Sequence, residues 1–145
     1  MIHQKDLRLG DLVQITVDLP EYKQGDTFVV IDICEIYIGL RSPSESDCRP
    51  DMYTIRDHIE GIHLTPDILE KNGWNKKHDP TSSCDIYSKG KDAFYVSLEQ
   101  SIYKKQEGFE LVVADSTYRF GNKLQYVHQL QHILWALGED AEIKV

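Results

Sequence analysis

Two histidines stand four residues apart near the end of the sequence, His128 and His132. On a helix, side chains at positions i and i+4 project side by side, and paired imidazoles can present ligands to a metal ion. The residues between them are Gln-Leu-Gln, so the glutamate of an HExxH metalloprotease is missing. The pair therefore indicates either a metal site or the polar flank of an amphipathic helix.

Two further histidines, His58 and His63, flank the segment Ile-Glu-Gly-Ile, and Asp57 precedes the first of them. An Asp-His dipeptide suits acid–base chemistry, but the sequence has no GxSxG turn, no GxGxxG loop and no P-loop. We therefore assign no catalytic residue and no cofactor, and an enzyme is the less favoured class. Whether His58, His63, His128 and His132 converge is left open.

Tyrosine is abundant, with 8 residues against 4 phenylalanines and 2 tryptophans. Tyr and Trp combine an apolar ring with a polar tip, so a surplus suits interfaces as well as core edges. Tyr37 and Tyr95 fall on the wet faces of expected strands, and Trp135 lies on the last expected helix. These three residues predict an interaction surface, for a protein partner or a second copy. Tyrosines that line half-buried strands are the alternative.

The charge is acidic and unevenly distributed. The chain has 16 basic and 24 acidic residues, a net charge of −8, of which residues 1–62 contribute −6. An acidic surface repels a phosphate backbone, so nucleic acid is a disfavoured partner. No apolar run approaches the roughly 18 residues of a membrane-spanning helix, and we expect no membrane association.

The three cysteines, Cys34, Cys48 and Cys84, show no CxxC or Cys/His ligand spacing. The N-terminal residues lack the apolar stretch of a secretory signal. We therefore expect reduced thiols and a cytoplasmic location. Cys34 sits in an apolar run and is expected to be a small core residue.

Residues 1–62 predict a small antiparallel β-barrel subdomain. Short alternating or β-branched segments favour strands at 11–17, 27–34, 35–41, 53–55 and 59–64. Alternation along the second segment places Phe28, Val30 and Asp32 on one face. The opening LRLGDLVQI resembles the start of SH3-like barrels.

Residues 63–145 predict an α+β subdomain that begins with a short helix over 66–72. Thr65 suits its N-cap, Pro66 its first turn, and Gly73 the left-handed residue after its end. A polar loop is expected over 75–83.

An antiparallel sheet and a C-terminal helix complete the predicted α+β fold. Strands are expected at 86–88, 93–99, 109–114 and 117–120, with 142–145 as an added edge strand. The helix is expected over 123–137, packed on the sheet, with Asn122 as N-cap and Gln125 completing a capping box. Its apolar stripe consists of Leu124, Val127, Leu130, Ile133, Leu134 and Leu137.

Two motifs resemble a group of small proteins from gut anaerobic bacteria and their phages or prophages. IHLTPDILEKNGW at 62–74 matches an LT-x-x-x-L-x-x-x-G-[FW] helix, and LQYVHQLQHILWALG at 124–138 contains the YVHQLQ helix. The resemblance covers about residues 59–145, and the first sixty residues look like an N-terminal addition. That group has no assigned activity, so the resemblance implies no functional residue.

These observations favour a small cytosolic accessory protein that binds a protein partner or works in assembly, encoded by a phage or another mobile element. A metal-dependent enzyme using His128 and His132 is one alternative. A nucleic-acid-binding SH3-like module is the other.

Overall fold

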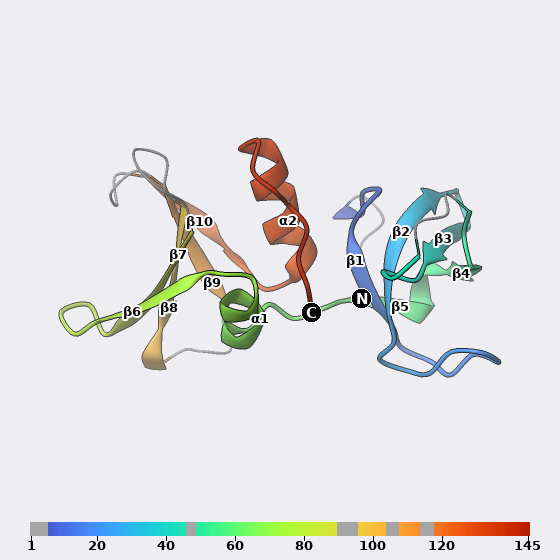
Figure 1. Cartoon of the computed structure of the whole chain (residues 1–145), viewed down its shortest axis with the longest axis horizontal. Coiled ribbons are helices and arrows are strands. Elements are labelled where there is room, and N and C mark those ends of the chain that lie inside the picture. Colours follow the sequence, from blue (N-terminus) through green and yellow to red (C-terminus); the bar gives the residue numbers. More distant parts are fainter. Residues whose placement is uncertain (1–5, 46–48, 90–95, 104–107, 114–117) are drawn as a thin grey trace. The chain divides into compact units, whose positions relative to one another are not determined.

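The chain forms two compact units, Met1–Ile62 and His63–Val145 (Figure 1). The computed structural model describes residues 6–45, 49–89, 96–103, 108–113 and 118–145. Each unit holds a five-stranded antiparallel sheet, and two α-helices lie in the second unit. The predicted α+β class is therefore confirmed.

The first sheet is open. Its strands are β1 (Leu12–Ile15), β2 (Thr27–Ile33), β3 (Tyr37–Arg41), β4 (Met52–Ile55) and β5 (Ile59–Gly61), in the order β4-β3-β2-β1-β5. A 3-10 turn at Arg56–His58 connects the two edge strands. Because β4 and β5 do not pair with each other in the described residues, the sheet is not closed, and the predicted SH3-like barrel is not confirmed.

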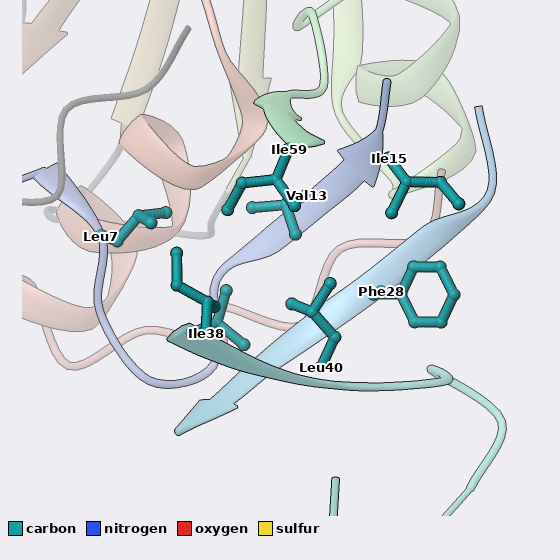
Figure 2. Close-up of a cluster of buried hydrophobic side chains, with 8 residues drawn as sticks. Leu7, Val13, Ile15, Phe28, Ile38, Leu40 and Ile59 are labelled. Carbon is teal, nitrogen blue, oxygen red and sulfur yellow. The ribbon is translucent and has the colours of Figure 1, made fainter. Parts of the chain in front are cut away.

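One face of this sheet supplies the core of the first unit. Figure 2 shows side chains from β1, β3 and β5 directed toward the same space. The buried residues are Leu7, Val13, Ile15, Phe28, Val30, Ile38, Leu40 and Ile59. Each such side chain contributes about 1.5–3 kcal/mol when removed from water. Val13 and Ile15 are two positions apart on β1 and both face this core, which follows the predicted period of two. The side chain between them points to the opposite face of the sheet.

A β-bulge in β2 changes which side chains face this core. The register with β3 runs from Val30 opposite Leu40 to Asp32 opposite Gly39, so one residue is inserted between the two pairs. After the bulge, Ile33 packs against the core, and Asp32 leaves it. The prediction that Asp32 shares a face with Val30 is therefore wrong. Cys34, expected in the core, is exposed.

The second sheet is a meander of sequential neighbours. Its strands are β6 (Asn75–Asp79), β7 (Cys84–Lys89), β8 (Val96–Ser101), β9 (Phe109–Val113) and β10 (Tyr118–Leu124). The loop predicted over 75–83 is wrong in its first half, where β6 forms an edge strand. Because β6 pairs only with β7 and buries almost no side chain, it lacks the hydrophobic alternation of an ordinary strand.

Helix α1 (Pro66–Lys71) confirms the predicted short helix, with Asn72 at its C-cap. The Thr65 hydroxyl accepts a hydrogen bond from the Ile68 N–H at 3.3 Å, as an N-cap does. Gly73 follows with φ +79°, the left-handed conformation that glycine adopts without strain.

Helix α2 (Val127–Ala136) begins four residues later than the prediction of 123–137. Leu124 still belongs to β10, and the carbonyl of Gln125 accepts a hydrogen bond from the Leu64 N–H at 2.8 Å. The Gln129 side chain accepts from the N–H groups of Gln125 and Tyr126, at 2.8 and 3.1 Å. The predicted cap at Asn122 is therefore wrong, because the start of the helix is fixed by Gln129.

Helix α2 contacts β10 and buries one stripe of its surface. Val127, Leu130 and Leu134 of the predicted stripe are buried. Among the described residues, no helix has the length and apolar character needed to cross a membrane.

The C-terminal residues are held by a side chain and not by a strand. The edge strand predicted over 142–145 is wrong, because no strand forms there. The Asn72 amide accepts from the Lys144 N–H at 2.8 Å and donates to the carbonyls of Lys144 at 2.8 Å and Ile68 at 2.7 Å. Ile143 is buried beside this clamp. One amide thus makes the two bonds that a neighbouring strand residue would make.

We expect Asn72→Asp to release this segment, because a carboxylate cannot donate to the two carbonyls. The loss should lower the free energy of unfolding by about 1–3 kcal/mol and speed hydrogen exchange at the Lys144 amide. Asn75→Asp, the same change at an exposed position of β6, is the control. Unchanged exchange at Lys144 in Asn72→Asp would show that the clamp does not hold the C-terminus.

Candidate functional site

Three large side chains are exposed together on the outer face of the first sheet. Tyr37 of β3 is 52% exposed, and Tyr53 and Ile55 of β4 are 57% and 38% exposed. Tyr37 pairs with Ile55 and Gly39 with Tyr53, so the three side chains project from one face of adjacent strands. Together with Gly39 of β3 and Asp32 of β2, these three residues are called the tyrosine face.

Gly39 makes the centre of the tyrosine face possible. A Cβ atom at this position would lie 2.8 Å from the Asp32 Cβ and 3.2 Å from the Tyr53 Cε1. Such distances are shorter than packed carbon atoms tolerate, so a larger residue would push the Tyr53 ring away. The ring therefore lies over the bare backbone of Gly39, and its hydroxyl donates to the Asp32 carboxylate at 3.4 Å.

The Asp32 carboxylate collects two donors. The Tyr53 hydroxyl is one, and the Cys34 thiol, whose Sγ lies 3.6 Å from the same oxygen, is the other. Partial desolvation, and then the charge and hydrogen bond of Asp32, raise the pKa of both Tyr53 and Cys34. A raised pKa keeps the thiol protonated near neutral pH, which opposes a role as nucleophile. The Asp32 carboxylate is thus hydrogen-bonded by two uncharged donors of its own chain.

A second feature is a row of four rings in the second unit. His63 and Tyr126 form an isolated β-bridge, and their ring centroids are 4.8 Å apart. Tyr126 stacks on His128 at 5.6 Å with 15° between the planes, and His128 meets His132 edge to face at 5.8 Å. His128 is only 3% exposed, whereas His63 is exposed. The arrangement places His128 as a packing residue between Tyr126 and His132.

The four histidines of the sequence prediction do not all lie in one unit. His58 belongs to the first unit, where its Nδ1 lies 3.3 Å from the Thr54 hydroxyl, and the other three lie in the second. Within the ranges described above, no group of three or more His, Cys, Asp or Glu side chains is arranged to hold a metal ion. A metal site at His128 and His132 therefore stays a prediction.

The predicted interaction residues have different outcomes. Tyr37 belongs to the tyrosine face. Trp135 is 59% exposed on α2 of the second unit, whereas the tyrosine face belongs to the first unit. Tyr95 lies outside the described residues, as does Cys48. Tyr53 and Ile55 were missed as interaction residues, although both lie on the strand expected over 53–55. Their spacing of two residues on that strand was the available signal.

Sequence reasoning also missed a charged cluster on β6 and β7. Lys76 Nζ and His78 Nδ1 each lie 3.1 Å from a different oxygen of the buried Asp85 carboxylate. Burial alone would raise the pKa of Asp85, but the hydrogen bonds and charges of Lys76 and His78 outweigh burial and lower it. The pKa of Lys76 is raised, first by its hydrogen bond to Asp85. The two-residue spacing of Lys76 and His78 was the signal, visible only once β6 is assigned as a strand.

This cluster ties the edge strand to the sheet. His78 lies directly opposite Asp85, and Lys76 lies diagonal to it, with its Nζ 5.6 Å from the centre of the Tyr87 ring. Because β6 contains no apolar side chain, these polar contacts and the backbone ladder are what hold it. We interpret the cluster as structural.

Comparison with known proteins adds no relative. A scan against protein-family models found no match, and neither did searches of curated proteins and of solved structures. Function is therefore inferred from the described side chains and their surroundings.

We expect Asp85→Asn to lower the free energy of unfolding by about 1–2 kcal/mol at pH 7, because charge-assisted hydrogen bonds are lost. The folded-state pKa of Asp85 is depressed, so its contribution is present above the ordinary carboxyl pKa and is lost as pH falls through the folded-state value. The difference between wild type and variant should shrink on acidification in urea unfolding curves. Glu139→Gln, at an exposed carboxylate, is the control. A difference that stays constant down to strong acid contradicts the ion-pair role.

Proposed function

We propose that the chain is a protein-binding module that recognises its partner through the tyrosine face. The observation that carries this proposal is the exposure of Tyr37, Tyr53 and Ile55 on adjacent strands. The opposite face of the same sheet already supplies a closed apolar core. The exposed rings are therefore not needed for that core, and a partner that covers them would gain the free energy of their burial.

The chemistry of the tyrosine face suits a protein interface. Tyrosine offers a large rigid ring with few rotatable bonds and a hydroxyl that can hydrogen-bond at the rim. The Tyr53 ring is already held between Gly39 and Asp32, so less side-chain freedom is lost when a partner binds. Exposed aromatic side chains fixed in this way are typical of residues that carry binding energy.

The wider expectations from the sequence belong to the same proposal. A cytosolic accessory role, an SH3-like character of the first unit, and an origin in a phage or mobile element all suit a small binding module. The net charge of −8 disfavours nucleic acid as the partner. A metal-dependent enzyme has less support, because His128 is buried beneath Tyr126 and no third ligand is placed within the described part of the chain.

Site-specific photo-cross-linking tests the proposal. A photoreactive phenylalanine analogue replaces Tyr37 or Tyr53 in the full chain, expressed in its host cells. We expect both positions to give one shared cross-linked product, because both rings lie on the tyrosine face. The control is Tyr103, which is 86% exposed in the second unit. Equal products from all three positions, or none from Tyr37 and Tyr53, would contradict the proposal.

Substitution gives an independent measure with the partner so identified. We expect Tyr53→Ser to weaken binding by at least ~10-fold, as truncation of a central interface tyrosine does. Tyr103→Ser should bind like the wild type. The thermal midpoint of each variant shows whether the fold is kept. In the cross-linking experiment, a cross-linked product of twice the chain's mass would identify a second copy as the partner.

A further inference from the structure

We propose that Asn72 is a site of spontaneous deamidation, protected while residues 143–145 are docked on it, and that the reaction leaves these residues permanently released. Residues 143–145 are called the Lys144 segment. The reaction consumes only water, and its product carries a carboxylate in place of the clamping amide. Asn72 lies in the second unit, so the inference is independent of the proposed binding at the tyrosine face.

The chemistry starts from the dipeptide Asn72-Gly73. The sequence has three asparagines, and only Asn72 precedes a glycine. Because glycine has no Cβ, its backbone nitrogen can approach the preceding side chain closely. That nitrogen attacks the Asn72 Cγ, so that a new C–N bond forms and the side-chain nitrogen leaves as ammonia. Water then opens the cyclic imide at either carbonyl, which gives aspartate or isoaspartate.

In the folded chain, the backbone at Asn72 keeps the two reacting atoms apart. Its ψ of +18° nearly eclipses the Gly73 nitrogen with the Asn72 nitrogen, and so turns the Gly73 nitrogen away from Cβ and Cγ. Ring closure needs the Gly73 nitrogen to eclipse Cβ instead, which requires a large rotation about the Cα–C bond. The Gly73 N–H also donates to the Glu70 carbonyl at 3.1 Å, and this hydrogen bond must break first.

The Lys144 segment holds the side chain that would react. Asn72 Nδ2 donates to the carbonyls of Ile68 at 2.7 Å and Lys144 at 2.8 Å, and Oδ1 accepts from the Lys144 N–H at 2.8 Å. Lys144 thus supplies two of the three partners, and the neighbouring Ile143 is buried. Because α1 ends at Lys71, undocking of the segment leaves Asn72 at a helix end that can fray while the rest of the unit stays folded.

The reaction runs in one direction because its product cannot rebuild the clamp. A carboxylate has no hydrogen to donate to the carbonyls of Ile68 and Lys144, and its charge would face both oxygens. Isoaspartate also lengthens the backbone by a methylene group just before Trp74. The Trp74 N–H donates to the Leu69 carbonyl at 3.1 Å and its side chain is buried, so this product disturbs the end of α1 as well.

Peptide mapping by mass spectrometry tests the inference on the full chain, incubated in neutral buffer and sampled over time. We expect deamidation at Asn72 to be at least ~10-fold slower in the folded protein than in the same protein unfolded in urea, because only the open form reacts. Ile143→Ala removes a buried contact of the Lys144 segment and should accelerate the reaction at least ~5-fold. The matched control is Val145→Ala, which changes an exposed side chain of the same segment and should react like the wild type.

A second control separates local opening from general loss of stability. Leu98→Val leaves a small cavity at a fully buried position of β8, and urea unfolding curves give its loss of stability beside that of Ile143→Ala. Below the unfolding transition, we expect its rate at Asn72 to stay within ~2-fold of the wild type, because the Lys144 segment remains docked. Protein aged until Asn72 has reacted should then show the fast exchange at the Lys144 amide that we expect of Asn72→Asp.

Several results would each overturn the inference. Equal rates in folded and unfolded wild type would show that the docked segment does not protect Asn72, and no reaction in urea would show that Asn72 is not a site. Ile143→Ala reacting no faster than Val145→Ala or Leu98→Val would show that the segment is not the gate. Slow Lys144 exchange in the aged protein would show that deamidation does not release the segment.

Discussion

The packing of the Tyr53 ring over Gly39 is the contact on which the proposed binding surface depends. Because Gly39 has no Cβ, the ring can cross β3 and reach the Asp32 carboxylate. Asp32 is available there only because the bulge in β2 turns it out of the core. The absent Cβ of Gly39 and the extra residue of the β2 bulge thus fix the Tyr53 ring on the outer face of the first sheet.

The two units are stabilised by different contacts around their five-stranded sheets. The first closes its core with one face of its sheet and leaves Tyr37, Tyr53 and Ile55 exposed on the other face. The second joins chain segments that are far apart in the sequence, where the Asn72 side chain holds Lys144 and the Leu64 N–H donates to the Gln125 carbonyl. The second sheet keeps β6 as an edge strand that, among the described residues, pairs only with β7, whereas the edge strand β4 of the first sheet carries the exposed Tyr53 and Ile55.

Local signals in the sequence predicted elements well, and long-range contacts decided the rest. The short helix was predictable because Thr65 and Gly73 act on neighbouring backbone groups. The start of α2 was not, because Gln125 is held by a bond from Leu64, 61 residues earlier in the chain. β6 has no apolar pattern to detect, and the bulge that turns Asp32 outward is set by pairing with β3. The tyrosine face was predictable only at Tyr37, since its other members are brought together by strand register.

Mapping the binding surface by NMR tests the central claim most directly. The ¹⁵N-labelled full chain is titrated with the partner identified by cross-linking, and amide shifts are followed residue by residue. Binding at the tyrosine face predicts the largest changes at Tyr37, Gly39, Tyr53 and Ile55, with the second unit little affected. Changes centred on His132 and Trp135 of α2, with β3 and β4 unperturbed, would contradict it.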